Sequence, residues 1–263
     1  MEEVMLSEEK IVENWDKLME IIEETFSGER KDNIIKMHEY FQDRMSMAPA
    51  SSFEHFHNAF PGGYVDHILN VIEFSKRVTE LWREAGARID FTNEELVFSA
   101  MFHDLGKVGD LFNDLYIPNE SEWHRNNQGR IYILNPKVEN MSVTDLSYML
   151  LNHFGIKYNL KEMMGIRLAD GMYADYNKSY LVAFESDKKL KTNLPFIIHE
   201  ADFLALHVEY DTWKYSDTEK QEKKLDKPSN KGVTKRKETL KEAVAKAGGT
   251  VITDAVFDDI FGV

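Results

Sequence analysis

The sequence predicts an all-α protein, because apolar side chains recur at steps of three and four residues along most of its 263 residues. Ile11, Trp15, Leu18 and Ile22 form the first such stripe. Similar patterns predict further helices over 34–41, 68–78, 92–102, 145–154, 161–169 and 194–208. Strand signals are few. Only 130–134, with turn-forming residues on both sides, predicts a small β-hairpin insertion.

Helix boundaries and breaks in the pattern divide the chain into three parts. Thr92 or Asn93 is suited to cap the helix that runs to Phe102. We expect residues 1–45 to form an N-terminal helical segment that packs on the core, and residues 46–212 to form the main domain. Between 211 and 233 the apolar periodicity is lost, which predicts an exposed lysine-rich linker. A short helix over 235–247 and an acidic-aromatic tail at 257–261 complete the third part, 213–263.

Composition excludes several classes of protein. The chain has no cysteine, so disulfides and thiolate chemistry are excluded and any metal must be held by His, Asp and Glu. Residues 1–213 carry 37 acidic and 21 basic side chains, a net charge of −16 that argues against binding of duplex nucleic acid. No apolar run approaches the roughly 20 residues of a membrane span, and we see no export signal. We therefore expect a cytoplasmic protein that does not bind membranes.

One segment combines polar chemistry with a buried setting. An apolar helix ends in His103-Asp104, followed by Gly106 and Lys107. Burial of an imidazole beside a carboxylate is costly unless each finds a partner, and a metal ion satisfies both. The alternative is a surface helix end at which the same two residues act as caps.

Two distant residues complete an ordered set. His67 stands 36 residues before His103, at the start of an amphipathic helix, and Asp202 stands 98 residues after Asp104, in a helix that otherwise faces the core. A lone His, a His-Asp pair and a distant Asp resemble the HD superfamily of metal-dependent phosphohydrolases, over roughly residues 45–210. The resemblance implies an HD-domain helical bundle with one metal site in its core.

Position by position, the resemblance implies that His67, His103, Asp104 and Asp202 bind one divalent metal ion. Two imidazoles and two carboxylates suit manganese, iron, cobalt or nickel better than calcium or magnesium. Such an ion lowers the pKa of a bound water and polarises a phosphoryl oxygen.

Two further residues are expected to take part in catalysis. The resemblance implies that Lys107 neutralises the charge of a phosphate; the alternative is a lysine that complements a helix dipole. Asp170 could act as a general base or orient a ligand, or it could simply form an Asp-Gly turn. The chain has Ala169 where related proteins place a histidine, which argues against a second metal.

Five residues complete the expected site. His57 and His153 are candidates for contact with the substrate, although each could instead be a packing histidine. Arg125 and Arg167 could bind phosphate oxygens through both guanidinium nitrogens, or be solvated surface cations. His199, three residues before Asp202, could hydrogen-bond a metal ligand and so orient it.

The leading hypothesis is a phosphohydrolase that acts on a small phosphorylated substrate, a nucleotide in particular. The first alternative is a 3′–5′ single-strand exoribonuclease, and the second is a nucleotide-binding sensor module without turnover. The protein could also form a homo-oligomer. The tail at 257–261 could bind a protein partner, although such a segment more often folds back on its own domain.

Overall fold

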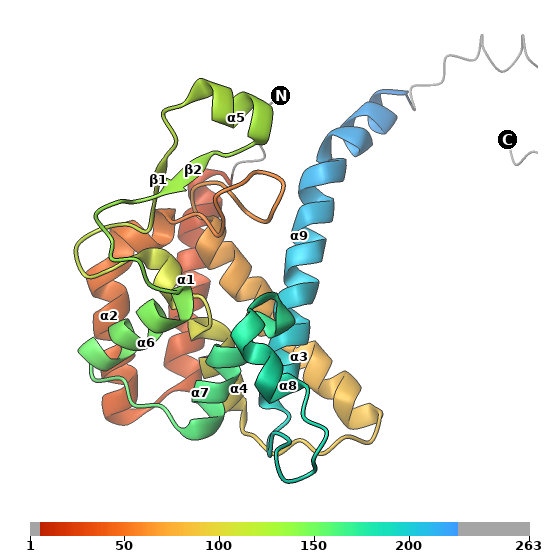
Figure 1. The fold of residues 1–263 in the computed structure, drawn as a ribbon. Helices are drawn as coiled ribbons and strands as arrows, with labels where there is room; N and C mark the ends of the chain where they lie inside the picture. The colour runs from red at the N-terminus through yellow and green to blue at the C-terminus, as the bar shows by residue number, and fades with distance from the viewer. Residues whose placement is uncertain (1–5, 226–263) are drawn as a thin grey trace, which may run out of the picture. The chain divides into compact units, whose positions relative to one another are not determined.

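The computed structural model describes residues 6–225, in which the chain is mostly helical with a single two-stranded sheet (Figure 1). The α-helices are α1 (Glu8–Thr25), α2 (Gly28–Met47), α3 (Gly63–Glu84), α4 (Asn93–Phe102), α5 (Glu122–Gln128), α6 (Val143–His153), α7 (Leu160–Leu168), α8 (Lys178–Leu181) and α9 (Leu194–Leu225). The 3₁₀ helices are η1 (Leu105–Val108), η2 (Gly171–Tyr173) and η3 (Asp175–Asn177), and the strands are β1 (Tyr116–Pro118) and β2 (Tyr132–Leu134). Every helix predicted within this range is present. None of the helices in the described part has the length and apolar character needed to cross a membrane.

The chain divides into two compact units, Met1–Lys214 and Tyr215–Val263. Helix α9 continues to Leu225, so the linker predicted from residue 211 onward is wrong for 211–225. The reason is local: after Pro195 the sequence has no Gly or Pro until Pro228, and Lys and Glu are good helix formers. The rest of that linker, the helix over 235–247 and the tail at 257–261 lie outside the described residues.

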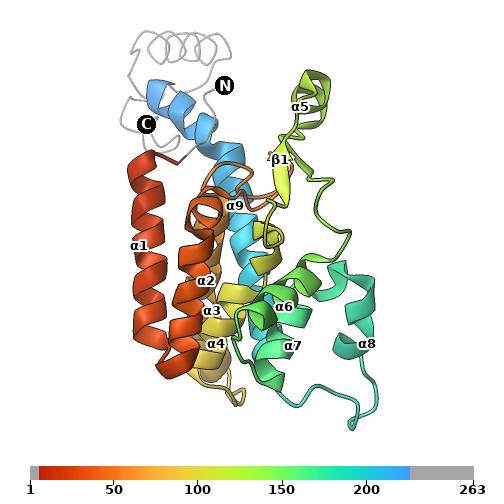
Figure 2. The ribbon, with the colours of Figure 1, turned by 90° about the vertical axis from the view of Figure 1, so that its left-hand side faces the viewer.

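Helices α1, α2, α3 and α4 pack on one another and contribute to the hydrophobic core of Met1–Lys214. Helices α1 and α2 lie side by side and both contact α3, which in turn packs on α4 (Figure 2). Each contributes the stripe of apolar side chains predicted from its spacing. The stripes consist of Trp15, Leu18 and Ile22 in α1, Ile34, Met37 and Phe41 in α2, Ile68, Val71 and Ile72 in α3, and Leu96, Phe98 and Phe102 in α4. Burial of this apolar surface stabilises the bundle, at roughly 25 cal/mol per Å² removed from water.

A capping box fixes where α4 begins. Oγ1 of Thr92 accepts a hydrogen bond from the backbone N–H of Glu95 at 3.1 Å, and the Glu95 carboxylate accepts one from the Thr92 N–H at 2.8 Å. Thr92, rather than Asn93, is therefore the N-cap. From Leu96 onward α4 is buried, and it ends at Phe102, with His103 as its C-cap.

Helices α3 and α9 run antiparallel to each other. Near the end of α3, Nε1 of Trp82 donates a hydrogen bond to Glu200 at 2.7 Å, and the Trp82 ring stacks on Phe196. Near the start of α3, His67 contacts Asp202 and Glu209, farther along α9. The antiparallel arrangement thus carries polar residues of α9 to the buried N-terminal end of α3.

The small sheet forms an insertion between η1 and α6. Strand β2 pairs antiparallel with β1, Tyr116 lying opposite Leu134, and the segment that connects the two strands contains α5, which lies beyond their ends (Figure 1). The predicted strand at 130–134 is thus confirmed in its second half. Its partner β1 was not predicted, because it is three residues long and ends in Pro118.

His38 of α2 is buried between aromatic rings of other helices. Its ring is 1% exposed and lies 6.1 Å, between centroids, from those of Trp15 and Phe102. Nδ1 donates to the Ile34 carbonyl at 2.8 Å. Burial lowers the pKa of His38 to about 4, and the hydrogen bond only partly opposes it.

We expect His38 to make the fold less stable in acid. The unfolded chain takes up a proton near the ordinary histidine pKa of about 6.5, whereas the folded chain resists protonation down to about 4. The stability that neutral His38 provides is therefore complete above that upper value and is lost as the pH falls toward the lower one.

Urea unfolding at about pH 7 and about pH 5.5 checks this expectation: the wild type should lose about 1 kcal/mol more than His38→Met between the two. An equal loss in both proteins would show that His38 is not the group responsible.

Candidate metal centre

Four polar side chains meet in the interior of Met1–Lys214. His67 comes from the second turn of α3, His103 and Asp104 from the end of α4, and Asp202 from α9. Nε2 of His67 lies 3.1 Å from Oδ1 of Asp202 and 3.6 Å from Oδ2 of Asp104. Nε2 of His103 lies 3.3 Å from Asp104 and 3.5 Å from Asp202. The structure thus brings together the four residues singled out from the sequence.

The two imidazoles present their Nε2 atoms to the shared space. Nδ1 of His67 lies 3.0 Å from a carboxylate oxygen of Glu209, and Nδ1 of His103 lies 2.8 Å from the carbonyl oxygen of Ala100. Those oxygens only accept, so both Nδ1 atoms carry a hydrogen. Both Nε2 atoms are buried without a hydrogen-bond partner.

A divalent cation fits this arrangement. The ligand atoms of His67, His103 and Asp202 lie within 4.8 Å of one another, and Asp104 adds a second carboxylate. Unpaired buried nitrogens beside two carboxylates are what such an ion satisfies. Nitrogen and oxygen donors together suit a transition metal.

Close packing against α6 holds the turn that follows the His-Asp pair. A Cβ on Gly106 would lie 2.1 Å from the carbonyl oxygen of Val143, so no other residue fits there without a shift. The Gly106 N–H donates to Oγ of Ser147 at 2.8 Å. Any side chain at position 106 would therefore push η1, and with it Asp104, away from α6.

The surrounding carboxylates favour charged histidines. Burial acts to lower the pKa of His67, but Glu209 and Asp202 outweigh it and raise the pKa to about 9. Burial is likewise outweighed at His103, where Asp104 and Asp202 raise the pKa well above its ordinary value.

The cations in turn keep the carboxylates ionised. Burial acts to raise the pKa of Asp104, yet Lys107 and His103 hold it well below the usual range. The two histidines also lower the pKa of Asp202 against its burial. Nζ of Lys107 lies 2.6 Å from Oδ2 of Asp104, and this contact overcomes burial and raises the pKa of the lysine.

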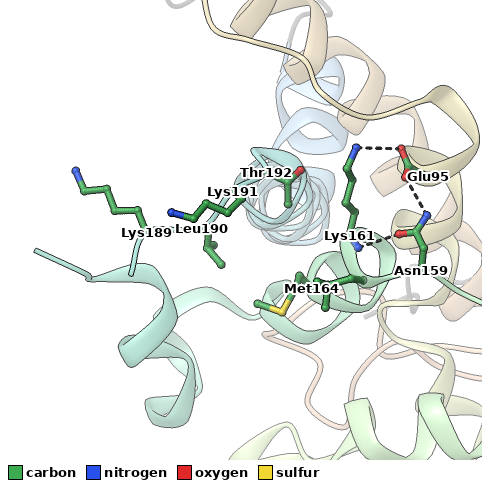
Figure 3. A pocket seen from close by; sticks show the side chains of 9 residues that line it. Glu95, Asn159, Lys161, Met164, Lys189, Leu190, Lys191 and Thr192 are labelled. Carbon is green, nitrogen blue, oxygen red and sulfur yellow. Dashed lines mark hydrogen bonds and ion pairs between the residues drawn. The ribbon is translucent and has the colours of Figure 1, made fainter. Parts of the chain in front are cut away.

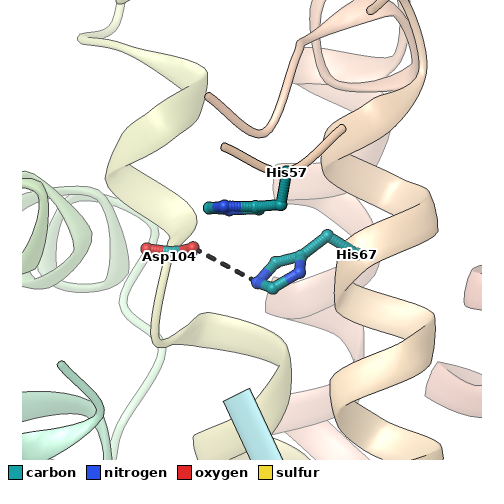
Figure 4. A group of neighbouring side chains, drawn as sticks. All are labelled: His57, His67 and Asp104. Atoms are coloured by element: carbon teal, nitrogen blue, oxygen red, sulfur yellow. Dashed lines mark ion pairs between the residues drawn. The ribbon is translucent and has the colours of Figure 1, made fainter. Parts of the chain in front are cut away.

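His57 lies over the same cluster, as Figure 4 shows beside His67 and Asp104. Its ring centroid is 4.7 Å from that of His67, and its Nε2 lies 3.2 Å from Nζ of Lys107. Burial and the nearby Lys107 charge hold the pKa of His57 well below its ordinary value. Because an ammonium group only donates, Nε2 accepts and Nδ1 carries the hydrogen. That Nδ1 is buried without a partner.

Asp170 stands at the edge of the cluster. Asp170 is exposed, yet partial loss of hydration, followed by the charges of Asp104 and Asp202, raises its pKa. His199 holds this segment: its Nδ1 donates to the Ala169 carbonyl at 2.7 Å. Only a glycine at 171 lets the chain pass the His199 ring, since a Cβ there would lie 2.2 Å from Cε1.

His199 thus fixes the backbone beside Asp170, and its ring nitrogen bonds that backbone rather than a metal ligand.

The structure also shows the surroundings of three other expected site residues. His153 is exposed at the end of α6, so it is not a buried packing histidine. Arg125 donates to the Asn119 carbonyl at 2.7 Å within the insertion.

Arg167 lies 3.9 Å from a carboxylate oxygen of Asp145, and its guanidinium lies over the ring of Tyr176. These contacts give Arg125 and Arg167 structural roles outside the cluster. Both arginines lie in the last turn of a helix, where the sequence alone says little about which way a side chain points.

Sequence reasoning missed Glu209, Asn70 and Tyr116. Glu209 bonds His67, and Asn70 donates to Glu209 at 2.9 Å. Tyr116 of β1 is close enough to Lys107 and Asp104 for their charges to affect its pKa, which burial raises. A signal for Glu209 did exist: it lies two turns after Asp202, on the buried stripe of α9.

A cavity of about 560 Å³ lies elsewhere, between the start of α7 and the segment before α9 (Figure 3). It is lined by Glu95, Asn159, Leu160, Lys161, Met164 and residues 189–192. Lys161 faces Glu95 across part of it, at 3.9 Å. None of the four clustered residues lines this cavity.

Comparisons of the chain with protein-family models, with curated proteins and with solved structures return no match. The candidate centre therefore rests on its own geometry.

We expect the full chain to bind one Mn²⁺ at the cluster. An ion that binds only the folded state stabilises it, by about 2.7 kcal/mol at a hundred times its Kd. Calorimetric titration and thermal unfolding measure both effects. His103→Ala should lose them, because it removes a ligand nitrogen.

His153→Ala is the matched control, since it removes an exposed imidazole, and it should bind like the wild type. Equal Mn²⁺ binding by His103→Ala and the wild type would contradict this assignment.

Proposed function

We propose that this protein is a metal-dependent phosphohydrolase of the HD type, which cleaves a phosphate ester or anhydride of a small phosphorylated substrate, a nucleotide in particular. One observation carries the proposal. Two buried imidazoles with unpaired Nε2 atoms face two carboxylates, and a lysine ammonium group lies 2.6 Å from one of them. Donors for a cation and a separate positive charge for an anion thus occupy one site.

His67, His103, Asp104 and Asp202 would hold the ion. When bound, a divalent ion at this position lowers the pKa of a water molecule and polarises a phosphoryl oxygen. The protein's own contribution is to hold the four ligands on three helices whose apolar faces are packed.

Lys107 supplies positive charge to the substrate phosphate. The Asp104 carboxylate keeps Lys107 protonated, so it is a cation at neutral pH. It is largely buried, which strengthens its attraction for an oxyanion. In the reaction its ammonium group stabilises negative charge that develops on the phosphoryl oxygens.

His57 can donate a hydrogen bond to the same phosphate. Its Nε2 accepts from Lys107, which leaves Nδ1–H buried without a partner. A buried donor without an acceptor costs roughly 1–3 kcal/mol, and a phosphoryl oxygen would recover that cost. His57 therefore orients the substrate as a neutral donor.

Asp170 is suited to accept a proton from the attacking water. Its side chain is exposed, so water can reach it, and the charges of Asp104 and Asp202 act on it. Loss of hydration and the neighbouring carboxylates raise its pKa, which makes it a better base than an ordinary aspartate.

The acidic body of the protein favours a small substrate. A net charge of −16 over residues 1–213 repels a long polyanion, whereas a discrete phosphate can reach one local cation. Binding of single strands normally needs a cationic path with stacking aromatics.

A release assay tests the proposal. The substrate panel contains nucleoside mono-, di- and triphosphates, a cyclic dinucleotide and a short single-stranded RNA, each with Mn²⁺. We expect hydrolysis of a small member, lost in Asp104→Ala together with metal binding. Cleavage of the RNA alone would favour an exoribonuclease. Tight nucleotide binding without any turnover would identify a sensor module and contradict the proposal.

A second variant separates Lys107 from the metal ligands. Lys107→Met should lower kcat by about 10²–10³, the usual effect of removing a charge-stabilising group. Its Mn²⁺ affinity should stay equal or increase, because a cation next to Asp104 has been removed. Steady-state kinetics and calorimetry measure the two effects.

Lys157→Met removes an exposed lysine and should leave both values unchanged. A normal kcat in Lys107→Met would exclude the charge-stabilising role.

A further inference from the structure

Glu209 is a buried carboxylate outside the four-residue cluster. It lies on α9, seven residues after Asp202, and is 6% exposed. A carboxylate in such a place is costly unless its oxygens are hydrogen-bonded. Both oxygens of Glu209 have donors from α3, a helix far away in the sequence.

The contacts of Glu209 are directed at one ring nitrogen. Nδ1 of His67 donates to the carboxylate, with Oε2 at 3.0 Å and Oε1 at 3.2 Å. Nδ2 of Asn70 donates to Oε1 at 2.9 Å. Asn70 lies one turn after His67 on the same helix, so α3 supplies both donors that restrain this carboxylate.

Helix α9 therefore contacts both nitrogens of His67. Asp202 lies 3.1 Å from Nε2, and Glu209 lies 3.0 Å from Nδ1. Residues seven apart share a helix face, which is how one helix reaches both edges of the ring. Because Nδ1–H is engaged by Glu209, Nε2 is the nitrogen left to face Asp104 and Asp202.

His103 is supported differently. Its Nδ1 donates to the Ala100 carbonyl, a neutral acceptor within its own helix turn. A carboxylate partner makes an imidazole a more basic ligand than a carbonyl partner does. The two histidines thus differ in their supports, and only His67 depends on a distant residue.

We infer that Glu209 is a positioning residue for the metal centre, which fixes the His67 ring with Nε2 toward the ion and strengthens that nitrogen as a ligand. The inference rests on the proposed function in that the same four residues hold the ion. Glu209 itself does not bind the ion, because both its oxygens lie on the Nδ1 side of the ring.

Metal affinity of the full-length protein tests this inference, with Mn²⁺ titrated by calorimetry. Glu209→Ala should bind Mn²⁺ about 10- to 100-fold more weakly, as expected when a support of a metal-binding histidine is removed. Glu209→Gln should lose less, because its amide oxygen still accepts from Nδ1 although the charge is gone.

Asp211→Asn is the matched control for charge. It removes a carboxylate two residues away on the same helix, at an exposed position, and should bind Mn²⁺ like the wild type. The visible absorption spectrum of the Co²⁺-loaded protein gives a second reading. Its bands should shift in Glu209→Ala, where the His67 ring is free to turn, and stay unchanged in Asp211→Asn.

Unchanged Mn²⁺ affinity in Glu209→Ala and Glu209→Gln would overturn the inference, as would an equal loss in Asp211→Asn. If Glu209→Ala does not fold, Glu209→Gln decides, with metal-free thermal unfolding as the check on folding. Absence of hydrolysis alongside the expected losses of affinity would remove the proposed activity and leave the role of Glu209 standing. A wild type that binds neither ion would contradict both.

Discussion

Burial of two imidazoles and two carboxylates in one small volume is the constraint on which the rest of the structure depends. Each buried charge costs several kcal/mol of hydration unless an opposite charge is held close to it. Here the carboxylates of Asp104 and Asp202 raise the pKa values of His67 and His103, while Lys107 contacts Asp104 directly. The group is therefore stable only as a set. A divalent ion would provide the same compensation through the two Nε2 atoms, which have no hydrogen-bond partner.

The helices meet this constraint by close packing. The α4 helix starts at a capping box and ends just before His103, so its length determines where the His-Asp pair lies within the core. The turn after it is pressed against α6 at Gly106, which leaves no room for a side chain. The α9 helix runs antiparallel to α3 and brings Asp202 and Glu209 to opposite edges of the His67 ring. Apolar packing of these helices thus holds the polar groups that could not stay buried separately.

Sequence reasoning could predict the parts of the fold that depend on local pattern. Helical periodicity and an N-cap at Thr92 or Asn93 are local, so the helices could be predicted. The four clustered residues were singled out because their order along the chain resembles the pattern of the HD superfamily. Glu209 was not recognised although it lies on the buried stripe of α9, because a glutamate in a helix usually faces solvent and its partner His67 is 142 residues away. Whether the His153 side chain is buried or exposed depends on where α6 ends. The helix over 211–225 was missed because a charged stretch without apolar periodicity resembles a linker, although its residues favour helix.

The central claim is that four side chains from three helices hold one cation. Anomalous diffraction from crystals of the full chain grown with Mn²⁺ tests it most directly, because the signal locates the metal without assumptions about activity. The account predicts a single strong peak bounded by Nε2 of His67, Nε2 of His103 and the carboxylates of Asp104 and Asp202. Manganese bound only to surface carboxylates, with no peak between the two imidazoles, would contradict it.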